Sequence, residues 1–211
     1  TLGIDYCYVV TAIYDYGQVE SCPSDTSCAR LVKEVPVITN VSVTDTDSLN
    51  GSNFIGWSKP TELDTVQYPG PYFYKVYSGS SQVNINTLIG QTVSNSSLEF
   101  VDTTLNDVNI NTSSATNFYR VEIFYSNNGT DSLVGTSNSA GSIFLNANPN
   151  DNQIELCWSE QVPWINTSYG IFRSNLLNGS YVSIGQTTQQ CYIDSGLVNG
   201  EEYCYYVVSD G

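Results

Sequence analysis

The sequence contains no histidine and no methionine among its 211 residues. Without histidine it lacks the usual general base, the Ser-His-Asp and Cys-His catalytic pairs and the commonest transition-metal ligand. These absences exclude most classes of enzyme. A glycosidase needs only two carboxylates, so it remains as the enzyme alternative to a protein without catalysis.

Positive charge is scarce too, because six Lys and Arg residues stand against 21 Asp and Glu residues and give a formal net charge of -15. Such a field repels the phosphates of nucleic acids and of anionic lipids. No stretch approaches the roughly 20 apolar residues of a spanning helix, and no signal-peptide pattern opens the chain. We therefore expect neither a nucleic-acid partner nor insertion into a membrane.

In place of charge the sequence is rich in Ser, Thr, Asn, Gly and Tyr, a composition typical of all-β proteins. Short runs that alternate apolar and polar residues are bounded by Gly, Pro, Asn and Asp, and they recur roughly every 8 to 12 residues. Helical periodicity of useful length is missing. The spacing predicts β-sandwiches, and the length suits two small modules.

An internal repeat of five segments in the same order supports this organisation. One copy reads FIGW (54–57), YKVYS (74–78), LIGQT (88–92), FVDTTL (100–105) and FYRVEI (118–123). The other copy reads IELCW (154–158), YGIFR (169–173), VSIGQT (182–187), YIDSGL (192–197) and YCYYVV (203–208). Trp57 and Trp158 are expected between the two sheets of a sandwich. Leu197 and Tyr203 predict a corner at which the tyrosine hydroxyl group ties down a loop.

Chain order assigns these segments to strands A to G of successive modules. Residues 35–142 are expected to form a complete module, and residues 143–211 a module that lacks its last strand. Residues 1–34 are expected to be the F and G strands of a truncated module, because residues 3–10 align with residues 200–207 and a turn falls near Tyr16. Isolated proteins avoid unpaired sheet edges, so we infer a window on a longer array with short linkers such as residues 35–37.

Several stretches resemble a known family, namely FIGWSKP, GPYFYKVY, IGQT, ELCWSEQVPW, YIDSGLVNGEEYCYYV and SDTSCARL. They are similar to the fibronectin type III repeats of large Bacteroidota surface proteins that end in a gliding-motility-associated C-terminal domain. The resemblance spans essentially all 211 residues and implies tandem fibronectin type III (immunoglobulin-like) β-sandwiches. It further implies export by the type IX secretion system to the extracellular side of the outer membrane, as a secreted or cell-surface protein. It supplies no catalytic residues.

The same resemblance implies O-linked glycans on triplets of Asp, Ser or Thr, and a small or apolar residue. Four triplets match this pattern, with the hydroxyl group on Ser48, Thr65, Thr103 and Ser132. The last two are expected at turns, where they would be the most accessible. A glycan at such a place would shield loops and sheet edges from proteases.

The six cysteines lie on strand-like runs rather than in paired C-x-x-C hooks, which disfavours zinc. Strand alternation turns Cys157 and Cys191 outward on neighbouring strands, where they can form a disulfide. Hairpin register places Cys7 opposite Cys28. Cys204 is the counterpart of Cys7, and its partner is expected in the absent last strand. Cys22 is left without an expected partner. These pairs favour an oxidising compartment, and the alternative is a cytosolic protein with buried free thiols.

Few residues suggest a binding site. Residues 45–51 have the oxygen-rich composition of a calcium loop, but a tight turn between strands A and B explains them better, so we expect no metal and no cofactor. Tyr68, Tyr72 and Trp164 lie in the loops before strand C, where exposed aromatics can stack on sugars or dock a partner. Alternatively, these loops cover a sandwich end or pack against the adjoining module.

The carboxylates weighed for glycosidase chemistry are Glu155, Glu160 and Asp194. Glu155 is expected on an outward strand face, and nothing apolar and concave surrounds the others to raise a pKa. We therefore expect no enzyme.

The interpretation that combines these features is a structural stalk segment whose partners are neighbouring modules of the same longer chain, with type IX secretion components or surface glycans as further partners. The alternatives are an adhesin or carbohydrate-binding module that uses the loop aromatics, and the accessory modules of a large extracellular hydrolase.

Overall fold

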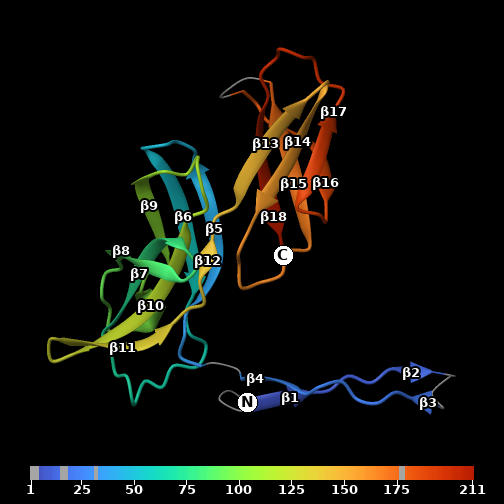
Figure 1. Ribbon diagram of the computed structural model, residues 1–211. Helices are drawn as coiled ribbons and strands as arrows, with labels where there is room; N and C mark the ends of the chain where they lie inside the picture. The colour runs from blue at the N-terminus through green and yellow to red at the C-terminus, as the bar shows by residue number, and fades with distance from the viewer. Residues whose placement is uncertain (1–4, 15–18, 31–32, 176–178) are drawn as a thin grey trace.

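The computed structural model describes residues 5–14, 19–30, 33–175 and 179–211, and these residues are organised almost entirely in β-strands (Figure 1). The described helical structure is the short 3₁₀ turn Leu98–Phe100. The turn predicted near Tyr16 lies outside the described residues. The all-β class that the alternating sequence pattern predicts is therefore confirmed.

The first sandwich consists of two antiparallel sheets. One sheet contains, in spatial order, β5 (Val37–Asp45), β6 (Gly51–Ser58) and β9 (Thr104–Ile110). The other contains β8 (Asn84–Gln91), β7 (Tyr72–Ser81), β10 (Phe118–Asn127) and β11 (Thr130–Thr136), with β12 (Ala140–Gly141) beside the start of β10. β5 thus pairs with β6 around the predicted turn at residues 45–51.

The core of this sandwich follows the predicted anchors. Trp57 is 3% exposed, and its ring centroid lies 5.4 Å from that of Tyr74 in an edge-to-face contact. Tyr74 and Val76 alternate inward on β7 and are fully buried. Apolar side chains from the two sheets meet here, and their removal from water is the main source of stability in such a layer.

The second sandwich repeats this arrangement with fewer strands. One sheet contains β13 (Phe144–Asn150), β14 (Gln153–Ser159) and β17 (Cys191–Ser195). The other contains β16 (Val182–Thr187), β15 (Ser168–Ser174) and β18 (Cys204–Asp210). Its core is formed by Leu156, Trp158, Tyr169 and Ile171.

The strand order defines the fold class. When the strands are lettered in chain order, the first sandwich has strands A, B and E in one sheet and strands C′, C, F and G in the other. The second sandwich has the same arrangement up to strand F. This is the arrangement of a fibronectin type III, immunoglobulin-like β-sandwich. Two such sandwiches follow one another along the chain (Figure 1).

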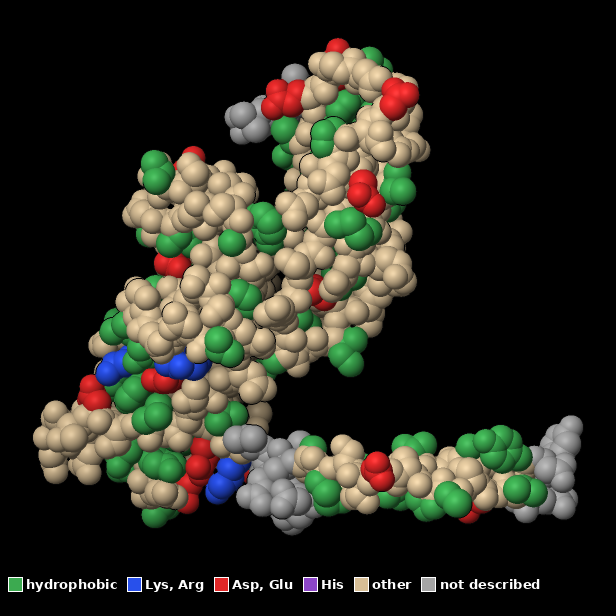
Figure 2. Space-filling view, viewed as in Figure 1, with side chains coloured by type: hydrophobic (Ala, Val, Ile, Leu, Met, Phe, Trp, Pro, Cys, Tyr) green, Lys and Arg blue, Asp and Glu red, His purple; other side chains and the backbone are tan. Residues whose placement is uncertain are grey.

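The N-terminal strands form a separate long hairpin. β1 (Asp5–Tyr8) pairs with β4 (Ser27–Arg30), and β2 (Ile13–Tyr14) pairs with β3 (Val19–Glu20). In Figure 1 this hairpin lies apart from both sandwiches. Tyr8 is 64% exposed and Val10 is 72% exposed, and Figure 2 shows hydrophobic side chains at the surface along the hairpin.

The register of strand E differs from the predicted alignment. Asp107 of β9 pairs with Asn53, and Asp194 of β17 pairs with Ile154 at the same position of strand B. The counterpart of Asp194 is therefore Asp107. Aligning FVDTTL with YIDSGL, which places Asp102 opposite Asp194, was wrong because Asp102 precedes the start of β9.

The predicted tyrosine corner is present in the second sandwich. The backbone N–H group of Val198 donates to the hydroxyl oxygen of Tyr203 at 3.0 Å. Leu197, directly before the loop, is buried. The hydroxyl group thus fixes the loop between β17 and β18, as the sequence predicts.

Candidate functional site

The aromatic loop of the first sandwich is folded onto its own core. Tyr72 is 3% exposed, and its hydroxyl group donates to the backbone carbonyl of Tyr68. Tyr68 is half-buried and lies edge-on to Tyr125, with 5.5 Å between ring centroids. Of the two alternatives for this loop, an exposed aromatic surface and a cover over the sandwich end, the structure shows the second for Tyr72.

Trp164 contacts the neighbouring sandwich. Together with Val162 it packs against the core of the first sandwich, although both residues belong to the loop between β14 and β15 of the second. Its indole Nε1–H group donates to Asn166 Oδ1 at 3.1 Å, and Asn166 Nδ2 donates to Glu160 Oε2 at 2.6 Å. The loop is therefore a structural contact between sandwiches.

The chain crosses between the two sandwiches at residues 140–143 without a free linker. Ser142 is 2% exposed. Its N–H group donates to the carbonyl of Asn117 at 2.9 Å, and its Oγ atom accepts the N–H group of Asn117 at 3.1 Å. The N–H group of Gly141 donates to the carbonyl of Gln161 at 2.8 Å. We call these contacts, with those of Trp164, the joint.

The predicted glycosylation residue Ser48 lies in an exposed turn. The Oδ1 atom of Asp47 accepts the backbone N–H groups of Leu49 and Asn50, each at 2.7 Å. These two bonds hold the pKa of the Asp47 carboxyl group below its ordinary value, and the bond from Asn50 has the larger effect. Ser48 is exposed and Leu49 is 74% exposed, whereas Asp47 is partly buried.

Thr65 occupies the same kind of turn. The Oδ1 atom of Asp64 accepts the backbone N–H groups of Val66 and Gln67, each at 3.0 Å. These bonds also lower the pKa of Asp64, and the bond from Gln67 has the larger effect. Val66 is 92% exposed and Thr65 is exposed.

The other two predicted glycosylation residues are less accessible, which reverses the expected order. Ser132 lies inside β11, opposite Tyr125, and is partly buried. Thr103 is partly buried directly before β9, and its carbonyl accepts the N–H group of Trp57 at 3.0 Å. Neither residue lies at the exposed turn that was expected.

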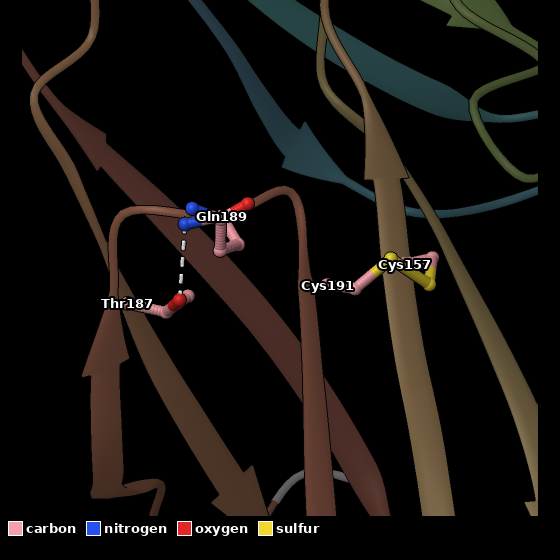
Figure 3. The surroundings of a disulfide bond; sticks show 4 residues. All are labelled: Cys157, Thr187, Gln189 and Cys191. Atoms are coloured by element: carbon pink, nitrogen blue, oxygen red, sulfur yellow. Dashed lines mark hydrogen bonds between the residues drawn. A yellow bond between two sulfur atoms is a disulfide. The ribbon is translucent and has the colours of Figure 1, made fainter.

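Two disulfides join neighbouring strands. Cys157 and Cys191 are directly opposite on β14 and β17 and are bonded, and Figure 3 shows this bond beside the turn in which the N–H group of Gln189 donates to Thr187 Oγ1 at 3.0 Å. Cys7 and Cys28 are directly opposite on β1 and β4 and are also bonded. The structure thus joins the pair that strand alternation predicts, Cys157 and Cys191, and the pair that hairpin register predicts, Cys7 and Cys28. Disulfides of this kind are typical of an oxidising compartment.

In each sandwich a tyrosine of strand F is paired with a buried aspartate of strand E. In the first, the Tyr119 hydroxyl group donates to Asp107 Oδ2 at 3.0 Å and accepts Asn53 Nδ2 at 2.7 Å. Burial raises the pKa of Asp107, although the bond from Tyr119 opposes the shift. Burial also raises the pKa of Tyr119.

In the second sandwich the aspartate has a cation beside it. Tyr205 donates to Asp194 Oδ2 at 2.9 Å, and Arg173 Nη1 donates to both carboxylate oxygens at 3.1 and 2.9 Å. The bond to Asp194 is the main cause that raises the pKa of Arg173. This carboxylate, a candidate for glycosidase chemistry in the sequence, is therefore held by the strands around it.

The other two carboxylates weighed for catalysis also have structural surroundings. Glu160 accepts the hydroxyl group of Tyr169 and the side-chain amide of Asn166 at the joint. Glu155 is exposed on β14. Among the described residues there is no cluster of three or more His, Cys, Asp and Glu side chains that could hold a metal ion. The described helical structure includes no helix of the length and apolarity needed to cross a membrane.

Comparisons with known proteins add no family assignment, since no family model matches the sequence and no curated protein matches it. Solved structures align over most of the chain. The FN1–FN3 domains of chicken CNTN1 are 12% identical, with 97% of this chain and 72% of that chain covered and a TM-score of 0.28. A two-domain fibronectin type III segment from chicken tenascin is 12% identical, with coverage of 82% and 90% and a TM-score of 0.27.

Domains A168–A170 from titin are a third such structure, 13% identical, with 98% of this chain and 82% of that chain covered and a TM-score of 0.29. At these TM-scores the alignments carry no weight. The class of the chain, a tandem fibronectin type III β-sandwich protein, rests on its own strand order.

Proposed function

We propose that the chain is a non-catalytic spacer segment of a stalk in a large secreted, cell-surface protein that the type IX secretion system exports. The observation that carries the proposal is the joint. The backbone bond from Gly141 to Gln161 and an aromatic loop packed across the boundary favour a fixed angle between sandwiches. A fixed angle lets successive modules hold a distal domain away from a surface.

The proposed array has residues 35–142 as a complete module, residues 143–211 as a module without its last strand, and residues 1–34 as the F and G strands of another. Two matching pairs of bonds support the last assignment. Val10 and Ser24 of the hairpin exchange N–H to Oγ and N–H to O bonds at 3.0 and 2.9 Å. Val121 and Ser137, on strands F and G of the first sandwich, exchange the same two bonds at 2.9 and 2.8 Å.

Other observations support the proposed export. Two cross-strand disulfides fit an oxidising compartment. The turns at Ser48 and Thr65 present hydroxyl groups within the triplets on which exported Bacteroidota proteins carry O-linked glycans. We expect glycan on Ser48 and Thr65 before Thr103 and Ser132, because a transferase needs an exposed hydroxyl group.

The sugar-binding alternative has less support. Tyr72 is buried and Trp164 belongs to the joint, so the two aromatics do not form one exposed platform. The hydrolase alternative concerns residues outside this sequence.

Non-reducing mass spectrometry of the protein from its source tests the proposal. We expect an intact mass well above that of the 211 residues, the two disulfides, and hexose-bearing peptides that contain Ser48 or Thr65. Peptides that contain Thr103 and Ser132 serve as the matched comparison. A bare chain with six free thiols would contradict secretion and the stalk together.

A further inference from the structure

The cation that pairs with the buried aspartate of the second sandwich has no counterpart in the first. Arg173 of β15 lies directly opposite Tyr205 of β18. Ser78 of β7 lies directly opposite Tyr119 of β10, the counterpart of Tyr205. Ser78 therefore holds in the first sandwich the position that Arg173 holds in the second. A short hydroxyl side chain stands where the second sandwich has a guanidinium group.

The aromatic ring beside that guanidinium group is replaced as well. The ring centroid of Tyr203 lies 5.5 Å from Arg173 Cζ. Tyr203 stands two residues before Tyr205, and Asn117 stands two residues before Tyr119. Asn117 is therefore the counterpart of Tyr203. Both large side chains at this place in the second sandwich are smaller ones in the first.

A pocket of about 320 Å³ lies at the place of these smaller side chains. It is situated between β7 and β8 of one sheet and β9 of the other, and its lining includes Ser78, Asn117 and Asp107. Asp107 is 7% exposed. The volume is at the lower end of the ~300–1,000 Å³ that is usual for small-ligand sites. The first sandwich thus has room for a ligand where the second has its own arginine.

The carboxylate in this pocket has one oxygen free to accept a ligand. Asn53 Nδ2 donates to the Tyr119 hydroxyl group, and that hydroxyl group donates to Asp107 Oδ2. Within the described part of the chain, Asp107 Oδ1 accepts no hydrogen bond and has no cation beside it. In the second sandwich, by contrast, Arg173 donates to both oxygens of the aspartate. A buried carboxylate without a cation is unfavourable when it is ionised, so a cation in this pocket would be stabilised.

We infer that the pocket over Asp107 binds a guanidinium group, supplied by an arginine from outside this chain. The group takes the place that the Arg173 head group has in the second sandwich and donates to Asp107 Oδ1. A guanidinium ion suits a partly buried site better than an ammonium ion, because it is planar and less strongly hydrated. The net charge of -15 attracts such a ligand. This site goes beyond the spacer function and does not rest on it.

The test is a titration of the whole 211-residue chain with methylguanidinium chloride at constant ionic strength. Nuclear magnetic resonance follows the ¹³C signal of the Asp107 carboxyl group and the amide signal of Ser78. The Asp194 carboxyl group is the internal control, because Arg173 already occupies its site. Methylammonium chloride is the matched control ligand, since it carries the same charge without the planar set of donors.

Two variants change the pocket in opposite ways. Asp107→Asn removes the charge and keeps nearly the same shape, so the fold is retained. Ser78→Arg supplies within the chain the group that the pocket is inferred to bind. Both variants should abolish the binding of methylguanidinium. Asp107→Asn alone decides the question if Ser78→Arg does not fold.

We expect methylguanidinium to produce saturable shifts at Asp107 and Ser78 in the millimolar range, as befits so small a ligand, and none at Asp194. Methylammonium should bind at least about tenfold more weakly, because it cannot donate two parallel hydrogen bonds. Shifts that do not saturate, equal binding of methylammonium, or unchanged binding to Asp107→Asn would each overturn the inference.

The source of the arginine is tested with two further ligands, free L-arginine and the peptide acetyl-Gly-Arg-Gly-amide. Tighter binding of the peptide would indicate an arginine of a partner chain, whereas tighter binding of the amino acid would indicate the free metabolite. Either result supports a guanidinium site. Failure of both ligands to shift Asp107 would contradict it and would leave the spacer proposal standing, because the joint involves none of these groups.

Discussion

At the scale of single residues, the two sandwiches stabilise a buried aspartate in different ways. Asp107 is held by the neutral side chain of Tyr119 and has no cationic partner among the described residues. Asp194 has Arg173 within 2.9 Å in addition to its tyrosine. A buried carboxylate without a cation costs free energy when it is ionised, whereas breaking a buried ion pair leaves the other charge unpaired.

Substitution of the two aspartates should therefore have opposite effects. The pKa of Asp107 is raised above 3.8 in the folded protein, so the stability linked to its protonation is present below that value and is lost as pH rises through the folded-state value. We expect Asp107→Asn to gain stability relative to the wild type between about pH 3.5 and pH 7 in urea unfolding. Asp194→Asn should instead lose about 2–3 kcal/mol at neutral pH, because Arg173 loses its partner. Parallel pH profiles for the two variants would refute this account.

At the scale of elements, the strands could be predicted where a large buried side chain marks them. Trp57 and Trp158 mark strand B in the sequence, and period-two alternation marks strand C. The alignment misplaced strand E in the first sandwich, because Val101-Asp102 resembles Ile193-Asp194. The register of a strand is decided by its pairing with the neighbouring strand, here strand B.

The predicted site residues were misplaced for a similar reason. Asn128 and Gly129 adopt positive φ angles of 51° and 81°, so they form the turn and draw Ser132 into β11. An Asn-Gly pair between two alternating runs is a strong hairpin signal and could have shown this. The sequence leaves two alternatives for Trp164, an exposed aromatic or packing against the adjoining module, because the choice depends on the angle between two sandwiches, and the structure shows the packing.

The cross-strand disulfide of the second sandwich should contribute measurably to its stability. Cys157 and Cys191 close a loop with a sequence separation of 34. The double variant Cys157→Ser, Cys191→Ser should lower the free energy of unfolding by about 3–4 kcal/mol, since the unfolded chain regains the entropy of that loop. Cys22→Ser is the matched control, because that thiol is exposed and free in the described structure. A loss equal to that of the control would argue against the bond.

At the scale of the whole molecule, the joint should set the angle between the sandwiches. Trp164→Ala removes the largest side chain that packs across the boundary. We expect each sandwich to keep its own core and the angle between them to become variable. The matched control is Ile165→Ala, since Ile165 is the next residue and is 84% exposed.

The most direct test of the spacer proposal is the distribution of distances between spin labels on the two sandwiches, measured by double electron–electron resonance. Exposed Val66 and Val198 are replaced by labelled cysteines, with Cys22 and Cys204 replaced by serine. The account predicts one narrow distribution, which Trp164→Ala broadens and Ile165→Ala leaves unchanged. A broad distribution in the parent protein, unaffected by Trp164→Ala, would contradict a fixed joint and with it the proposed spacer.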